Sequence, residues 1–225
     1  MVKHSAFSPG NRPPDRHAAL AQYRFRANGY DSELALFEPL RREAVARLNL
    51  GRSDTVLDVG CGTGLSFALL DDAVGHQGRI VGIEQCPEMM DKARERIAER
   101  GWKHVSLVQA PAETAHLDEL ADAALFHFTH DVLQCPEAIA NVLRHLRPGA
   151  RVVATGLHWA PLWAWPVNLF VLGAALYSVT AMDGLGQPWS GLAKQLDAFE
   201  VDDGAMMGGV YMATGTWRGA EHRGT

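Results

Sequence analysis

The chain has 225 residues, a formal net charge of −5 at pH 7 and a sequence pI near 6.0. Hydrophobic residues make up 47% of it, which suits one α/β domain with a full core. A negative net charge gives no broad attraction to phosphates, so we expect no nucleic-acid partner. Cys61, Cys86 and Cys135 form no C-x-x-C pair. They indicate neither a disulfide framework nor a zinc site, so we expect no metal and a cytoplasmic location.

The N-terminal part divides into a polar end and a helical segment. Residues 1–16 have no apolar core, which argues against a signal peptide, and we expect them to be flexible. Residues 17–50 have a helical pattern that Pro39 divides into two pieces. We expect this segment to cap the domain, with Tyr23 and Tyr30 on it.

The most informative stretch runs from Thr55 to Gly64. Its apolar residues predict a buried parallel strand, which stops at an acid and a loop with glycine at 60, 62 and 64. Glycines allow positive φ and let a ligand lie against the backbone. A helix from about Leu65 would then point its amino end at that ligand.

Two nucleotide-binding readings fit this loop poorly. A phosphate-binding P-loop needs a Lys-Ser/Thr pair after its last glycine, but Leu65 and Ser66 follow Gly64. The dinucleotide fingerprint G-x-G-x-x-G needs glycine where Leu65 stands. A nicotinamide cofactor is therefore the weaker reading.

Residues 58–64, Asp-Val-Gly-Cys-Gly-Thr-Gly, resemble the first motif of the class I methyltransferases that use S-adenosylmethionine. The resemblance implies a doubly wound α/β fold. Its sheet has seven strands, mostly parallel with the last antiparallel, and helices on both faces. It also implies S-adenosylmethionine as cofactor and S-adenosylhomocysteine as product. Residues 79–84 fit the second strand, and the two acceptor oxygens of Glu84 suit both ribose hydroxyls.

The resemblance extends to a larger set of cofactor-binding residues. In the family an acid after the third strand holds the adenine amine, but here Pro111 occupies that position. The adenine contact then falls to Glu113 or to the backbone at Ala112, although Glu113 also fits a plain acid at a helix start. The expected cofactor-binding residues are Tyr30, Asp58, Gly60, Cys61, Gly62, Gly64, Glu84, Gln85, Ala112, Glu113 and His127.

The fourth strand, from Ala123, ends in a cluster of titratable residues. Ligands of open α/β sheets bind at the carboxyl ends of strands, so chemistry is expected at His127, His130 and Asp131. A histidine with an ordinary pKa of about 6.5 can take a proton from an acceptor, and Asp131 can orient it or bind an amine. Alternatively, His127 only contacts the cofactor or packs beneath it.

Residues 152–182 contain no Asp, Glu, Lys or Arg. Pro161, Pro166 and Asn168 interrupt this segment, so we expect no membrane span, while peripheral membrane contact stays open. We interpret 157–198 as an apolar lid or insertion after the fifth strand. Its surface at 159–182 suits a homodimer. The residues expected to wall an acceptor pocket are Tyr23, Trp159, Trp163 and Tyr177.

The predicted organisation is one methyltransferase domain over 17–217, followed by a flexible end at 218–225. The implied reaction is in-line transfer of a methyl group to an amine or hydroxyl of a small metabolite. Three alternatives stay open. The same cofactor can undergo attack at another carbon, giving aminocarboxypropyl transfer or cyclisation. The chain can also be a non-catalytic cofactor-binding partner, or an oxidoreductase, which Leu65 disfavours.

Overall fold

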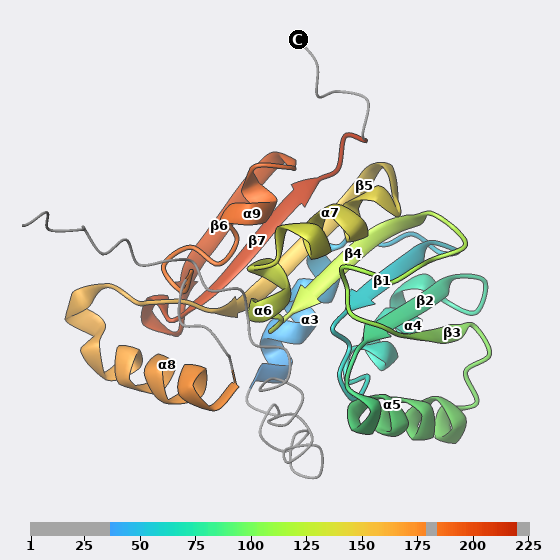
Figure 1. The fold of residues 1–225 in the computed structure, drawn as a ribbon, viewed down its shortest axis with the longest axis horizontal. Helices are drawn as coiled ribbons and strands as arrows, with labels where there is room; N and C mark the ends of the chain where they lie inside the picture. Colours follow the sequence, from blue (N-terminus) through green and yellow to red (C-terminus); the bar gives the residue numbers. More distant parts are fainter. Residues whose placement is uncertain (1–36, 179–183, 220–225) are drawn as a thin grey trace, which may run out of the picture.

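The computed structural model describes residues 37–178 and 184–219, which form a seven-stranded sheet (Figure 1). The strand order is β3-β2-β1-β4-β5-β7-β6. The strands are β1 Thr55–Val59, β2 Arg79–Glu84, β3 Val105–Gln109, β4 Ala121–His127, β5 Leu146–Leu157, β6 Asp197–Ala205 and β7 Val210–Thr216. β7 pairs antiparallel with β5 and β6, and the other pairs are parallel. The predicted sheet is confirmed.

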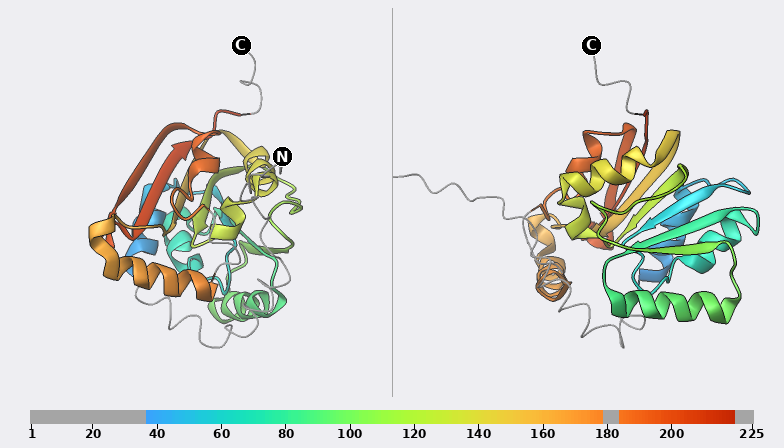
Figure 2. Two further views of the ribbon diagram at one scale, coloured as in Figure 1. Left: turned by 60° about the vertical axis from the view of Figure 1, so that its left-hand side comes forward. Right: turned by 45° about the vertical axis from the view of Figure 1, so that its right-hand side comes forward.

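Helices cover both faces of this sheet (Figures 1 and 2). They are α3 Glu38–Arg47, α4 Phe67–Val74, α5 Pro87–Arg100, α6 His130–Leu133, α7 Pro136–Arg144, α8 Trp165–Ser178 and α9 Ser190–Ala193, with short 3-10 turns η2 Leu162–Ala164 and η3 Met206–Gly208. Side chains of α3, α4 and α5 form one core layer, and those of α6, α7 and α9 form the other. This doubly covered arrangement explains why every residue of β1 is buried.

Local sequence signals set the ends of α5. Cys86 is extended and Pro87 occupies the first turn, where proline's missing N–H removes no intrahelical bond. The helix ends at Gly101, whose φ of 67° is left-handed. Met90 and Ala93 face the sheet and are buried. Proline at the start and glycine at the end therefore set the length of α5.

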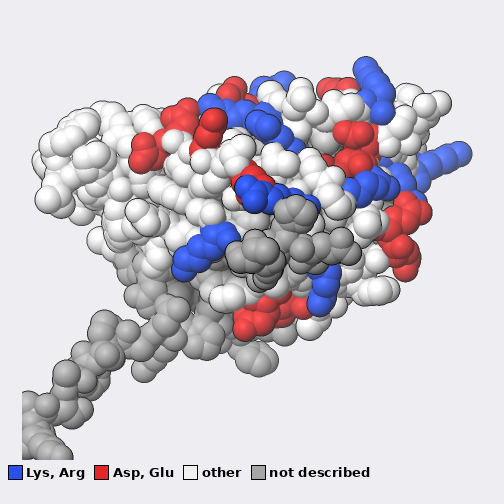
Figure 3. Space-filling view, turned by 90° about the horizontal axis from the view of Figure 1, so that it is seen from above, with Lys and Arg blue, Asp and Glu red and all other residues white. Residues whose placement is uncertain are grey.

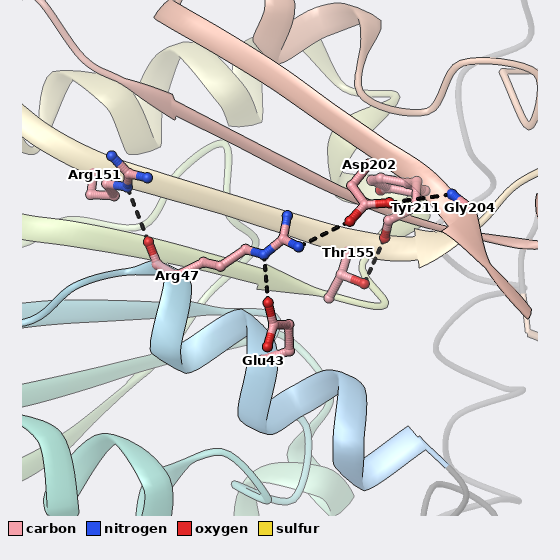
Figure 4. Close-up of polar contacts among 7 residues, drawn as sticks. All are labelled: Glu43, Arg47, Arg151, Thr155, Asp202, Gly204 and Tyr211. Carbon is pink, nitrogen blue, oxygen red and sulfur yellow. Dashed lines mark hydrogen bonds and ion pairs between the residues drawn. The ribbon is translucent and has the colours of Figure 1, made fainter.

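Arg47, the last residue of α3, links this helix to β5 and β6 (Figure 4). Arg47 Nε donates to Glu43 Oε1 at 2.8 Å, and Nη2 donates to Asp202 Oδ2 on β6 at 3.0 Å. The Arg47 carbonyl accepts from Arg151 Nε on β5 at 3.0 Å. The hydrogen bond from Arg47 lowers the pKa of Asp202. The end of α3 is therefore tied to two strands.

α8 lies outside both helical layers and packs through a small cluster of its own (Figures 1 and 2). Asn168 closes the turn before it, because its Oδ1 accepts from Ala160 N at 2.8 Å and its Nδ2 donates to Ala160 O at 3.1 Å. Large apolar side chains remain exposed on η2 and α8: Leu162, Trp163, Trp165, Leu169, Phe170 and Leu176. Among the described residues, no helix has the length and apolar character needed to cross a membrane.

Three short features complete the fold. β5 begins at Leu146, so residues 147–149 belong to it. α6 follows β4 almost directly, and α9 is a single short helix before β6. Most of the 17–50 cap and most of both predicted flexible ends fall outside the described residues. On the face drawn in Figure 3, basic and acidic side chains are interspersed.

Candidate functional site

The carboxyl ends of β1, β2 and β4 meet at one edge of the sheet. Val59 pairs with Ile83 of β2 and with Phe126 of β4. The next residue on each strand path is Gly60, Glu84 or His127, so these three predicted site residues lie side by side. The amides of Gly60 and Cys61 both donate to Ile83 O, at 2.8 and 3.0 Å. The loop after β1 is thereby bent towards β2.

Glycine is sterically required in this loop. Gly60, Gly62 and Gly64 have φ of 68°, 56° and 78°. A Cβ on Gly60 would lie 2.6 Å from Thr129 Cγ2, and a Cβ on Gly64 would lie 2.4 Å from the Phe67 ring. The left-handed backbone and the close neighbours both exclude larger residues. The result is a bare stretch of main chain at the edge of the sheet.

Glu84 has both carboxylate oxygens held by backbone amides. Gly62 N donates to Oε2 at 3.1 Å and Cys86 N donates to Oε1 at 2.7 Å. Burial raises the pKa of Glu84, while these amide donors oppose the increase. Each carboxylate oxygen has a second lone pair, so two adjacent hydroxyls can still donate to it. Gln85 follows, half-buried at the same strand end.

Two opposite charges are buried beside this loop. Asp58 is 2% exposed and Arg41 of α3 is 3% exposed. Burial raises the pKa of Asp58 to about 7, although the Arg41 charge opposes this. Asp58 Oδ2 and the Nε and Nη2 of Arg41 have no hydrogen-bond partner among the described residues. Arg41 also forms an ion pair with Glu38.

Arg41 was missed by the sequence reading. The signal that identifies it is its position on α3, because Arg41, Ala44, Val45 and Leu48 recur at the i, i+3, i+4, i+7 spacing of one buried helix face. A charged residue on such a face is rarely fully buried. Although Arg41 pairs with Glu38, its Nε and Nη2 have no hydrogen-bond partner among the described residues, so it is a candidate for ligand binding.

The connection after β3 is held by a second missed residue, Asn141 of α7. Its Nδ2 donates to the carbonyls of Ala112 and Ala115, at 2.7 and 2.8 Å. Ala112 is buried and Glu113 is half-buried. The amide of Ala110 donates to Glu84 O at 3.1 Å, which places the start of this connection next to Glu84.

Two predicted residues have a more restricted chemistry than their types suggest. Burial raises the pKa of the Cys61 thiol well above its usual value, so the thiol stays protonated and unreactive. Burial, with a smaller effect of Arg41, lowers the pKa of His127 to about 3. A group with so low a pKa accepts a proton only weakly, so a role for His127 as general base stays an untested prediction that this environment disfavours. Its neutral ring leaves a contact role.

His130 and Asp131 lie at the start of α6, directly after Thr129, which packs against Gly60. The turn that leads to them contains Phe128, whose φ of 58° is left-handed. A bulky residue in this conformation is strained, and such strain clusters at functional sites. The Phe128 amide donates to Thr155 O of β5 at 2.8 Å, which holds the turn.

Aromatic rings connect this turn to α8, but they are not the predicted ones. Phe128 packs on Phe37 with centroids 4.7 Å apart, and Phe37 lies 6.5 Å from Phe170. Trp163 is 72% exposed, so it does not wall an enclosed pocket, and Trp159 is half-buried against the α8 cluster. The remaining predicted residues of this kind lie outside the described part of the chain: Tyr23, Tyr30 and the side chain of Tyr177.

Comparisons with known proteins agree with this geometry. Residues 56–149 match the model of a methyltransferase domain family. Aklanonic acid methyltransferase DauC of Streptomyces sp. (strain C5) is 31% identical over 53% of this chain and 55% of its own length. A demethylmenaquinone methyltransferase of Alkalihalophilus pseudofirmus is 30% identical over 50% of this chain and 49% of its own length. The chain thus spans about half the length of these curated relatives.

The fold has close counterparts among solved structures. N-methyltransferase NodS from Bradyrhizobium japonicum WM9, in complex with S-adenosyl-L-homocysteine, superposes with a TM-score of 0.65. The match covers 88% of this chain and 98% of NodS at 20% identity, so it concerns the fold. The fold is therefore the one that the first motif predicts, that of the class I methyltransferases, and residues 56–149 within it match a methyltransferase domain family.

Proposed function

We propose that the protein is a methyltransferase that uses S-adenosylmethionine and releases S-adenosylhomocysteine. The single observation that carries this proposal is Glu84, with both carboxylate oxygens fixed by backbone amides next to a loop of three left-handed glycines. A carboxylate oriented in this way fits vicinal ribose hydroxyls, and the bare loop fits a close-lying ligand.

The buried charges suit the other end of such a cofactor. Its methionyl part carries an ammonium and a carboxylate, and its sulfur is cationic. Asp58 Oδ2 is available for a cationic group and the free guanidinium nitrogens of Arg41 for the carboxylate. We assign the adenine contact to Glu113 or the backbone at Ala112, in the connection that starts next to Glu84 at Ala110.

The chemistry asks mainly for positioning. When bound, the cofactor supplies a methyl group that a nucleophile attacks in line with the departing sulfur. Holding two reactants in this geometry contributes about 7–11 kcal/mol, whereas a general base adds about 10²–10⁴-fold. We assign the base role, where the acceptor needs one, to His130, and an orienting or amine-binding role to Asp131.

The acceptor we propose is a small metabolite with an amine or hydroxyl and an aromatic or partly apolar body. The support is the row of rings formed by Phe128, Phe37 and Phe170, which runs from the end of β4 to α8. Trp159, Trp163 and Tyr177 remain candidates for contact with the acceptor.

Two alternatives need a direct test. The same contacts would bind the cofactor for attack at another carbon, or in a protein without catalytic activity. Calorimetry with S-adenosylmethionine, S-adenosylhomocysteine and NAD tests cofactor class, and we expect binding of the first two only. Incubation with a panel of aromatic amines and phenols, followed by mass spectrometry, should show a product heavier by one methylene unit. Binding without any such product, or a product carrying aminocarboxypropyl, would refute methyl transfer.

We also propose that the exposed apolar side chains of η2 and α8 contact a second copy of the chain. Leu162 is 93% exposed and Leu176 is 66% exposed, and they belong to a group of six large apolar side chains exposed on η2 and α8. Grouped exposed apolar side chains are typical of a surface that binds a partner. Sedimentation of the wild type and a Leu162→Glu, Leu176→Glu variant tests this. We expect a dimer that becomes a monomer, and a monomeric wild type would contradict it.

A further inference from the structure

Three potential metal ligands meet at the opposite end of the sheet from the cofactor site. Asp71, His76 and His104 each offer one ligand atom, and these atoms all lie within 4.8 Å of one another. Asp71 is in α4, His76 precedes β2, and His104 precedes β3. The Ile80 amide of β2 donates to the His104 carbonyl at 3.0 Å. These positions are at the amino ends of the parallel strands, whereas Glu84 lies at a carboxyl end.

The carboxylate of this group is already oriented. Trp102 Nε1 donates to Asp71 Oδ2 at 2.8 Å, so the other oxygen, Oδ1, faces His104 Nε2 at 2.9 Å. The His104 and Asp71 side chains are 13% and 19% exposed, while His76 is exposed. The ring of His76 lies 6.0 Å from that of His104 at 85°. Metal-bound carboxylates are commonly held by an outer hydrogen bond of the kind that Trp102 provides.

We propose that Asp71, His76 and His104 bind a divalent transition-metal ion, with Zn²⁺ as the probe. Two imidazoles and one carboxylate form a donor set that suits Zn²⁺, and the open side at His76 leaves a fourth position for water. Ligand atoms around tetrahedral Zn²⁺ lie about 3.3 Å apart, given metal–ligand distances of about 2.0–2.2 Å. The distance between His104 Nε2 and Asp71 Oδ1, 2.9 Å, is already near this value. A rotation of the exposed His76 ring can bring its nitrogen to a similar distance from both.

A hydrogen bond between His104 and Asp71 is enough to explain why these two side chains lie together. It does not involve His76, which brings a third ligand atom to the same point from a separate turn. The proposed ion joins the end of α4 to the starts of β2 and β3. Its role is structural, because none of the three residues lies among those assigned to the cofactor.

The first experiment measures Zn²⁺ binding to the full chain. Titration calorimetry and elemental analysis after desalting should give one Zn²⁺ per chain. His76→Ala removes an exposed ligand with little effect on packing. Asp71→Asn keeps an oxygen that accepts from Trp102 and an amide that can donate to His104, but it loses the anionic ligand. We expect each substitution to weaken Zn²⁺ binding at least 10-fold.

His116→Ala is the matched control. The His116 ring lies 6.1 Å from the His145 ring at an interplanar angle of 81°, a geometry similar to that of His76 and His104. His116 Nε2 also lies 4.0 Å from Asp118 Oδ1. These residues do not bring three ligand atoms together among the described residues. We expect its Zn²⁺ affinity to equal that of the wild type. Loss of affinity in His116→Ala equal to that in His76→Ala would show general surface binding and overturn the proposal.

A second measurement reports on the proposed structural role. Zn²⁺ at about 100 times its Kd should raise the wild-type Tm by roughly 5–10 °C, since it binds only the folded chain. The Tm of Asp71→Asn should not respond to Zn²⁺, while its affinity for S-adenosylhomocysteine should match that of the wild type. A wild type that binds no Zn²⁺, or an equal Zn²⁺-dependent shift in Asp71→Asn, would overturn the proposal.

Discussion

Arg41 and Arg42 show how burial divides two adjacent side chains of one type. Both pair with Glu38, but the Arg41 side chain is 3% exposed and that of Arg42 is 65% exposed. A buried cation with free donors is costly unless a ligand completes its hydrogen bonds, whereas an exposed cation is satisfied by water. Under the proposed function, the cofactor carboxylate would supply the acceptors that Arg41 Nε and Nη2 lack.

Arg41→Ala therefore tests the assignment of the cofactor carboxylate. Hydrogen bonds to charged groups contribute about 1.5–3 kcal/mol, so we expect the Kd for S-adenosylhomocysteine to rise about 10–150-fold by calorimetry. Arg42→Ala is the control, and its Kd should match the wild type. Equal effects of both substitutions would remove Arg41 from the site.

Glu84→Ala tests the ribose contact. Loss of two charge-assisted hydrogen bonds should raise the Kd for S-adenosylhomocysteine at least 100-fold. Because Glu84 also accepts from Gly62 and Cys86, the variant should lose stability as well, so Tm and Kd are measured separately. Glu99→Ala on the exposed side of α5 is the control for removing an acid. An unchanged Kd in a folded Glu84→Ala protein would contradict the assignment.

At the scale of elements, the connection after β3 depends on one amide in α7. Asn141→Ala leaves two carbonyls, of Ala112 and Ala115, without the donor that they share. A lost buried hydrogen bond costs about 1–3 kcal/mol, so we expect the Tm to fall by about 2–12 °C. Asn141→Asp keeps the shape of the side chain but removes its N–H donors, so its Tm should fall at least as far. An unchanged Tm would mean that other groups hold this connection.

The proposed acceptor site includes Phe170 of α8. Phe170→Ala removes a ring from the row that leads to Phe128, so KM for the acceptor should rise about 3–10-fold with little change in the Kd of S-adenosylhomocysteine. Leu176→Ala, on the same helix and more exposed, should leave KM unchanged. A larger effect of Leu176→Ala would place the acceptor elsewhere on α8.

At the scale of the molecule, Asp58 and His127 have opposite effects on how the free energy of unfolding depends on pH. The pKa of Asp58 is raised to about 7, so its contribution to stability is present at low pH and is lost as the pH rises from about 4 to 7. The pKa of His127 is lowered to about 3, so its contribution is present above about pH 6.5 and is lost as the pH falls. Between these limits the two effects partly cancel.

Single substitutions should reveal each effect. From pH 5 to 6.5, Asp58→Asn should gain stability as the pH rises, because His127 remains, and His127→Gln should lose it, because Asp58 remains. One proton changes stability by about 1.4 kcal/mol per pH unit, so Tm should change by about 3–5 °C per unit in opposite directions. Thermal melts across this range provide the measurement, and parallel slopes would contradict the assignments.

The sequence predicted the parts of the molecule that local chemistry determines. The strand before Gly60, the acid at the end of β2 and the ends of α5 follow from periodicity, glycine and proline. Arg41 and Asn141 act across long sequence separations, so their roles depend on packing that no local pattern shows. The lowered pKa of His127 also depends on burial, and the aromatic row joins three segments that are distant in the chain.

The contacts of Glu84 and the glycine loop have a consequence for turnover. Both would hold the adenosyl half, which is the same before and after the methyl group leaves. The product thioether then competes with the cofactor for the same site, and the methyl group with its positive charge on sulfur is the difference between the two ligands. The rate of the enzyme at steady state would thus depend on how quickly a separate reaction consumes S-adenosylhomocysteine.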